Sequence, residues 1–205
     1  MKTRLLFCLL LISTALYGQQ TITVKYFGLT IHPAGDKTAN IQPYKLDKNA
    51  VFVANFGGFI GYERYLHEDL VSAKTISAVF TDCSGGFAVV QHLGIRGTLM
   101  KLEKHRIYAG LGPTLLVRDS WTRFGDAYQS SGFFNLSNTK TFGDVQWKLI
   151  PYGFEFEYDY VFTDKNQLTV SFTPGVPLAA ILSVGWKHWF NVKSYKQYKV
   201  YVPKD

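Results

Sequence analysis

The amino-acid sequence predicts an all-β protein, an antiparallel up-and-down β-barrel of eight strands that crosses a membrane. Three observations support this prediction: a leader typical of export, long segments that alternate between apolar and polar residues, and connections whose lengths differ between the two ends of the sheet. The composition agrees, because Phe, Tyr and Trp make up 16% of the 205 residues and 18 residues are glycine, a mixture that favours strands and tight turns.

The first 18 residues have the layout of a secretory signal peptide. Lys2 and Arg4 give a positive start, an apolar core runs from Leu5 to Leu16, and Gly18 is the small residue at the expected cleavage point. The alternative is a membrane anchor, but an apolar core of this length is too short to span a bilayer as a stable helix. We therefore predict that residues 1–18 are a signal peptide and that the protein is exported.

No other stretch has the roughly 18 uninterrupted apolar residues of a membrane helix. An exported protein of this kind is secreted, periplasmic or an outer-membrane barrel, and the strand pattern decides. Eight segments have strand patterning, namely 21–32, 51–66, 71–82, 87–100, 106–118, 146–162, 167–173 and 179–192. We expect residues 19–192 to form one barrel domain, followed by a basic, tyrosine-rich tail over 193–205.

The segment 146–162 shows the alternation best. Ile150 and every second residue as far as Phe162 are apolar or aromatic, whereas the opposite face carries Glu155, Glu157 and Asp159. Strands of ten or more residues with aromatic residues near their ends are typical of bilayer-spanning barrels, and soluble strands usually have about five or six residues. We expect the aromatic face to contact lipid and the carboxylates to point inward.

The predicted connections differ between the two ends of the sheet. Short charged turns at 67–69, 101–104 and 163–166 share one end, whereas long loops at 33–50 and 119–145 and short links at 83–86 and 174–177 share the other. Short periplasmic turns and long external loops are the outer-membrane arrangement.

On this architecture the sequence resembles the eight-stranded outer-membrane barrels, the OmpX-like and OmpA-like transmembrane domains. The resemblance covers nearly all of the chain after the leader and implies localisation in the cell outer membrane, with outer-membrane lipid as a partner. Such barrels tend to end on an aromatic residue that the assembly machinery reads. Trp189 and Phe190 would fit that role, although the tail follows them.

The interior of an eight-stranded barrel is just filled by side chains. The alternation predicts an interior polar cluster that consists of Glu63, His92, Arg96, Arg118, Glu155, Glu157, Asp159 and Lys187. A lone charge out of water costs several kcal/mol, so we expect salt bridges and no conducting path. As alternatives, Glu155 and Glu157, about 6.6 Å apart along the strand, could act as an acid and base pair or line a narrow ion path.

The 119–145 loop is the best candidate for contact with an unknown surface partner. It contains Trp121, Arg123, Tyr128, Phe133 and Phe134 among small polar residues. Exposed aromatic residues on a surface loop often mark a contact site. The alternative is that these side chains pack together or cap the mouth of the barrel.

The remaining chemistry-bearing residues show no site pattern. Cys8 lies in the leader, so Cys83 is expected to be a free or intermolecularly paired thiol on an exposed link. The five histidines have no metal-ligand spacing, and no glycine loop for a nucleotide is present, so no metal or cofactor is expected. The formal net charge is +7, but without the clustered basic patch that nucleic-acid binding requires.

The sequence favours a structural or surface-interaction role without enzymatic activity, and two other functions remain open. The first is a lipid A-modifying acyl hydrolase, a family that places a His and a Ser two residues apart on a late strand. Here Ser183 and His188 are five apart and on opposite faces, so they cannot form a nucleophile–base pair. The second is a soluble exported barrel whose aromatic face encloses an apolar ligand.

Overall fold

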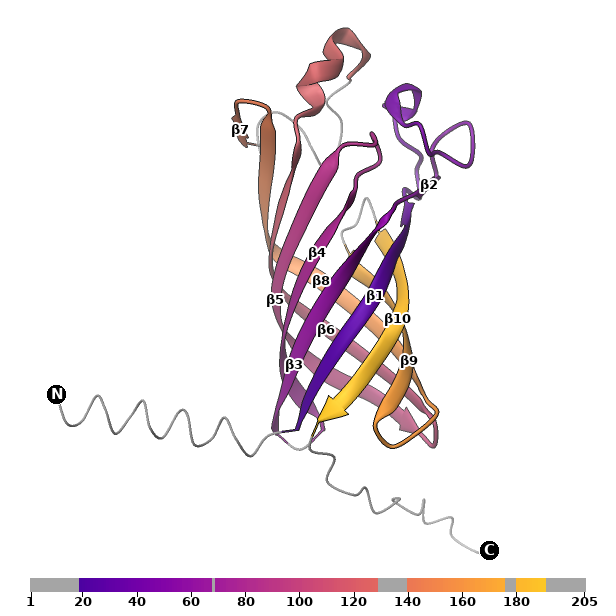
Figure 1. Cartoon of the computed structure of the whole chain (residues 1–205), viewed down its shortest axis with the longest axis vertical. Coiled ribbons are helices and arrows are strands. Elements are labelled where there is room, and N and C mark those ends of the chain that lie inside the picture. Colours follow the sequence, from indigo (N-terminus) through magenta and orange to yellow (C-terminus); the bar gives the residue numbers. More distant parts are fainter. Residues whose placement is uncertain (1–18, 68, 129–139, 176–179, 191–205) are drawn as a thin grey trace, which may run out of the picture.

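The computed structural model describes residues 19–67, 69–128, 140–175 and 180–190. Eight strands in this part of the chain form the barrel wall: β1 (Gln20–Ile31), β3 (Gly57–His67), β4 (Val71–Thr81), β5 (Phe87–Leu102), β6 (His105–Asp119), β8 (Val145–Val161), β9 (Asn166–Gly175) and β10 (Ala180–Phe190). Each is antiparallel to its neighbours, and β10 pairs with β1 to close the sheet (Figure 1). The predicted fold class is confirmed.

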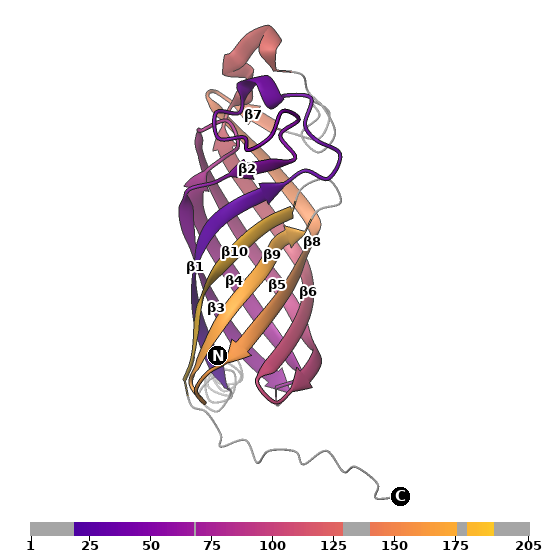
Figure 2. The same ribbon diagram turned by 90° about the vertical axis from the view of Figure 1, so that its right-hand side faces the viewer.

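The two ends of the barrel differ as the connection lengths predicted. The turns after β3, β5 and β8 lie at the lower end in Figures 1 and 2, where β1 begins and β10 ends. The upper end carries the long connections, with the 3-10 helices η1 (Ala39–Ile41) and η2 (Trp121–Ala127). The leader and the tail are outside the described residues.

The predicted second strand, 51–66, is two strands in the structure. It is interrupted after β2 (Phe52–Ala54), because Asn55 turns inward and its side chain donates to the Thr81 carbonyl at 2.9 Å. β2 pairs with the upper end of β1, and Lys45 bridges to Val53, so a small sheet extends the wall upward. A second short strand, β7 (Lys140–Phe142), pairs with the start of β8.

A bulge in β8 corrects the predicted position of Ile150. The register between β6 and β8 shifts between the pairs Gly112–Gly153 and Thr114–Ile150, so Ile150 faces the interior and is 8% exposed. The prediction that it shares the outward aromatic face is wrong. Pro113 and Pro151 lie at this shift, and a proline, which has no N–H to donate, is tolerated in a sheet at a bulge.

The outer wall is apolar. Its large exposed side chains include Val24, Tyr26, Ile60, Tyr62, Leu93, Ile95, Leu99, Leu111, Leu149, Phe154, Leu168 and Trp186. An apolar surface of this extent around a charged interior is the arrangement of a bilayer-spanning barrel, so this is a β-barrel of the outer-membrane type. It also contradicts the alternative of a soluble barrel with its aromatic face turned inward. Among the described residues, no helix is long and apolar enough to cross a membrane.

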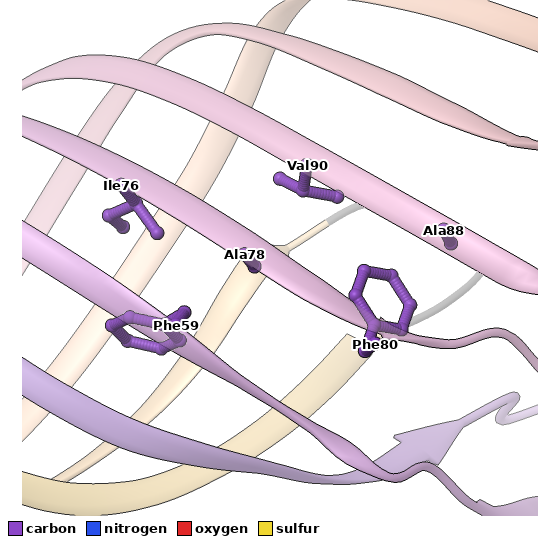
Figure 3. Close-up of a cluster of buried hydrophobic side chains, with 6 residues drawn as sticks. All are labelled: Phe59, Ile76, Ala78, Phe80, Ala88 and Val90. Atoms are coloured by element: carbon purple, nitrogen blue, oxygen red, sulfur yellow. The ribbon is translucent and has the colours of Figure 1, made fainter.

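The interior changes character along its length. Ser72 and Lys74 point inward from the lower part of β4, whereas higher on the same face Ile76, Ala78 and Phe80 are buried. Together with three residues of β3 and β5 they form the apolar cluster, which consists of Phe59, Ile76, Ala78, Phe80, Ala88 and Val90 (Figure 3). The lumen is therefore polar toward the lower end and apolar on one side above that.

Candidate functional site

An ion-pair layer crosses the lumen. It comprises eight charged side chains from six strands, each at most 2% exposed: Lys25 (β1), Glu63 (β3), Lys74 (β4), Arg96 (β5), Glu155, Glu157 and Asp159 (β8), and Lys187 (β10). Four are cations and four are carboxylates, so their formal charges cancel. Charges buried to this degree are retained only when they are paired.

Glu157 is the centre of the ion-pair layer. Its Oε1 accepts from Arg96 Nη1 and Lys187 Nζ, and its Oε2 accepts from Lys25 Nζ and from Lys74 Nζ, the last at 2.8 Å. One carboxylate on β8 thus joins β1, β4, β5 and β10 across the lumen. Bonds between ionised partners are the stronger class of hydrogen bond, so this contact set fixes the strands relative to one another.

The other three carboxylates each pair with one of the same cations. Glu63 receives both Nε of Arg96, at 2.8 Å, and Nη2, a bidentate contact. Glu155 pairs with Lys74, and Asp159 pairs with Lys187 at 2.5 Å. Within the ion-pair layer, only Lys25 has Glu157 as its sole ion-pair partner; it also donates a hydrogen bond to the Ser171 hydroxyl at 2.7 Å.

The structure brings six of the eight predicted interior residues into this layer and buries all eight. His92 and Arg118 are buried elsewhere in the lumen. Lys25 and Lys74 belong to the layer but were missed. The signal was present for Lys25, because Thr21, Thr23 and Lys25 form one polar face that alternates with Ile22 and Val24.

His92 on β5 forms a second buried polar contact. Its Nδ1 lies 2.6 Å from Thr114 Oγ1 on β6. Inward glycines make room for the pair: a Cβ on Gly94 would lie 2.5 Å from His92 Nε2, and one on Gly153 would lie 2.0 Å from Thr114 Oγ1. Sequence reasoning missed this hydroxyl–imidazole pair because its members lie on different strands. Both residues are at most 1% exposed, so lipid on the outer wall cannot reach them.

Ser183 and His188 are separated as their spacing predicts. Ser183 points inward, and its hydroxyl lies 3.0 Å from that of Ser171. His188 is on the outer wall, between the rings of Trp186 and Phe190, with Nδ1 2.9 Å from Asn166 Oδ1. This pair cannot act as nucleophile and base. Within the described part of the chain, no group of three or more His, Cys, Asp or Glu residues is arranged to hold a metal ion.

At the upper end, Trp121 is a structural side chain and not an exposed contact. It is 6% exposed, its Nε1 donates to Asp82 Oδ2 at 2.5 Å, and the Arg118 guanidinium lies 3.9 Å from its ring centroid. Tyr128, half-buried, packs edge-on against it with a centroid distance of 5.8 Å. The prediction of an exposed Trp121 is therefore wrong. The hydrogen bond to Asp82 and the contact with the Arg118 guanidinium hold its indole ring on the inner side.

Asp82 also folds the link that follows it. Its Oδ1 accepts from the backbone N–H groups of Ser84 and Gly86 at 2.9 and 3.0 Å. The turn carries Cys83 into a buried cluster with Ala50, Val53 and Trp121, where it is 8% exposed. The expectation of an exposed thiol is wrong. Burial, together with the neighbouring Asp82 carboxylate, raises the pKa of Cys83 to about 12.

The upper connections form one packed unit, which we call the outer cap: residues 32–55, 82–86 and 119–128. η1 contacts η2, and Asn40 Nδ2 donates to the Ala127 carbonyl at 3.4 Å. Asp47 accepts backbone N–H bonds from Phe52, Val51 and Asn49, which hold the pKa of its carboxyl below the ordinary value. The loop is thereby closed on itself.

Two of the predicted contact residues remain to be placed. Arg123 is exposed and forms an ion pair with Asp119 at 3.3 Å. Phe133 and Phe134 are outside the described residues. The structure describes three of the five predicted contact residues, and of these three Arg123 is the exposed one.

Comparison with known proteins gave matches only among solved structures. No protein-family model and no curated protein matches the chain. Among solved structures, Ail of Yersinia pestis, in complex with the heparin analogue sucrose octasulfate, has a TM-score of 0.48 at 14% identity, covering 84% of this chain and 99% of Ail. OprG of Pseudomonas aeruginosa, an outer-membrane protein, has a TM-score of 0.46 at 10% identity, with 85% and 97% covered. The N-terminal β-barrel domain of OprF from the same organism has a TM-score of 0.42 at 14% identity, with 84% and 99% covered.

Proposed function

We propose that this outer-membrane barrel is a non-conducting, non-enzymatic protein with a structural or surface-interaction role, and that its outer cap is the contact surface. The ion-pair layer is the observation that carries the proposal. Eight side chains, each at most 2% exposed, fill the lumen with charges that cancel. A barrel of eight strands leaves no open path beside them.

An ion that passed this layer would have to replace the partners of several buried charges. Removing one partner of a buried ion pair typically costs about 3–5 kcal/mol, and Glu157 alone pairs with four cations. Above the layer, the apolar cluster offers no polar side chain to an ion on that side of the lumen. Both features favour a sealed barrel.

The interaction role rests on the order of the outer cap. A surface that is already folded loses less conformational entropy on binding than a loose loop does. Arg123 and, in the 33–50 loop, Lys48 are exposed on the surface of the outer cap. Phe133 and Phe134 stay predicted contacts.

Single-channel recording in a planar lipid bilayer tests the seal. The refolded protein is expected to give no unitary conductance steps, in contrast to a porin measured in the same bilayer. Reproducible conductance steps of one size, whose frequency increases with protein concentration, would overturn the non-conducting part of the proposal.

Labelling of intact cells tests the position of the outer cap. In a Cys83→Ala background, Lys48→Cys is expected to react with a membrane-impermeant maleimide, because Lys48 is exposed in the outer cap. Lys104→Cys, in the short turn between β5 and β6, is the matched control and should react only after the cells are broken. The reverse pattern would place the outer cap in the periplasm and refute the surface role.

A further inference from the structure

Polar atoms without a hydrogen-bond partner in the protein gather in the lower part of the lumen, near the end where β1 begins and β10 ends. Among the described residues, seven buried side chains there have such an atom: Thr23, Tyr65, Tyr108, Asp159, Gln167, Thr169 and Trp189. All are at most 4% exposed. We call them the periplasmic polar cluster.

The strand register makes this cluster continuous on the inner wall. Asp159 of β8 is opposite Thr169 of β9, and Gln167 of β9 is opposite Lys187 of β10. Lys187 is in turn opposite Thr23 of β1. The free oxygen of Asp159, Oδ1, belongs to the same carboxylate whose Oδ2 accepts from Lys187, so the cluster adjoins the ion-pair layer from below.

Aromatic side chains form the lower side of the cluster. The rings of Tyr65 and Trp189 stack with centroids 4.8 Å apart, and the Tyr65 hydroxyl and Trp189 Nε1 both lack a protein partner. The Tyr108 hydroxyl lacks one as well. Donors and acceptors therefore face the same part of the lumen from β3, β6, β8, β9, β10 and β1.

Buried polar groups in folded proteins are almost always hydrogen-bonded, to protein or to ordered water. Gln167 is the clearest case, because neither its amide oxygen nor its amide nitrogen has a protein partner although the residue is fully buried. A buried water makes about three hydrogen bonds to groups of this kind. Hydroxyl, amide, carboxylate and indole groups on adjacent strands supply that number.

We infer that ordered water molecules occupy the lower part of the lumen and bridge the periplasmic polar cluster to the ion-pair layer. The ion-pair layer fills the lumen above this site with side chains that are at most 2% exposed. The water therefore enters from the lower end of the barrel. Entry from one side rests on the proposed seal, whereas the water site itself does not.

Magnetisation transfer from water in NMR spectra of the protein in lipid nanodiscs tests the site directly. The side-chain amide protons of Gln167 are expected to show cross-peaks at the water frequency. The methyl groups of Val90, which is 1% exposed in the apolar cluster, are the internal control and should show none. Absence of transfer to Gln167 would overturn the inference, whatever the conductance of the barrel proves to be.

A nearly isosteric substitution gives an independent test. If Thr169 Oγ1 is bonded to water, Thr169→Val removes those bonds and lowers the urea midpoint of unfolding. If the hydroxyl is dry, the same substitution removes an unsatisfied group and raises the midpoint, which would overturn the inference. Thr114→Val is the matched control, because Thr114 is equally buried but its hydroxyl contacts His92, and its midpoint should fall.

Discussion

Replacing Glu157 with Gln should destabilise the barrel through one identifiable cation. The substitution keeps the shape of the side chain but leaves four cations facing three carboxylates in the ion-pair layer. Lys74 retains Glu155, Arg96 retains Glu63, and Lys187 retains Asp159. Lys25 loses its ion-pair partner and keeps the hydrogen bond to the Ser171 hydroxyl.

The expected cost follows from that single uncompensated charge. Removing one partner of a buried ion pair typically costs about 3–5 kcal/mol. Glu157→Gln should therefore lower the free energy of unfolding by roughly that amount. A second substitution, Lys25→Met, removes the stranded cation, so the double variant should recover most of the loss, since apolar replacement of a buried pair is often neutral.

Urea unfolding of the protein in lipid vesicles, followed by tryptophan fluorescence, measures both changes. The difference in gel mobility between boiled and unboiled samples counts the folded fraction independently. The reasoning fails if Glu157→Gln costs less than about 1 kcal/mol, or if the double variant is no more stable than the single one, because the energy of a coupled pair must appear in such a cycle.

Three further outcomes are expected from the same structure. Gly153→Ala places a Cβ 2.0 Å from the Thr114 hydroxyl oxygen and should lower the free energy of unfolding in urea by about 1–3 kcal/mol. Gly97→Ala is the control, because its Cβ would meet nothing nearer than 4.0 Å, and it should leave the free energy of unfolding nearly unchanged. Equal effects of the two substitutions would contradict this packing. Trp121→Phe leaves a buried carboxylate without its indole donor and should speed proteolysis of the outer cap, and an unchanged digestion rate would show that the contact does not hold it. Burial raises the pKa of Cys83 from 9.0 to about 12, so the protonated thiol favours the folded state. This contribution to stability is complete below pH 9 and declines between pH 9 and pH 12. Comparing the unfolding of Cys83→Ala with that of the parent protein across this pH range checks the expectation.

The alternation of residues along the strands was sufficient to predict the closed barrel. It also predicted the burial of Glu155, Glu157 and Asp159, because successive side chains on a strand point to opposite faces. The same pattern was present for Lys25, in a segment with three Thr residues, and for Lys74, in a segment with Thr, Ser and Ala, but both lysines were missed. Alternation is a local property, so it carried these predictions without knowledge of the partners.

Where local alternation ends, the sequence no longer predicted the positions of side chains. The bulge at Pro151 reversed the face of Ile150, since the register between two strands depends on both of them. At the upper end, Trp121 and Cys83 were expected at the surface because loops usually are. Asp82, far from Trp121 in the sequence, accepts its indole N–H and turns both residues inward.

The sequence by itself determined the all-β class, the eight strand segments, the two kinds of connection and the sign of the charges on the inner face. Only the tertiary structure decided which cation pairs with which carboxylate, because ion pairs such as Lys25 with Glu157 join residues that are 132 positions apart in the sequence. It also decided where the lumen is apolar and where its polar atoms lack a protein partner. These properties depend on the closure of β10 onto β1, which sets every cross-lumen distance and is not a property of any local segment.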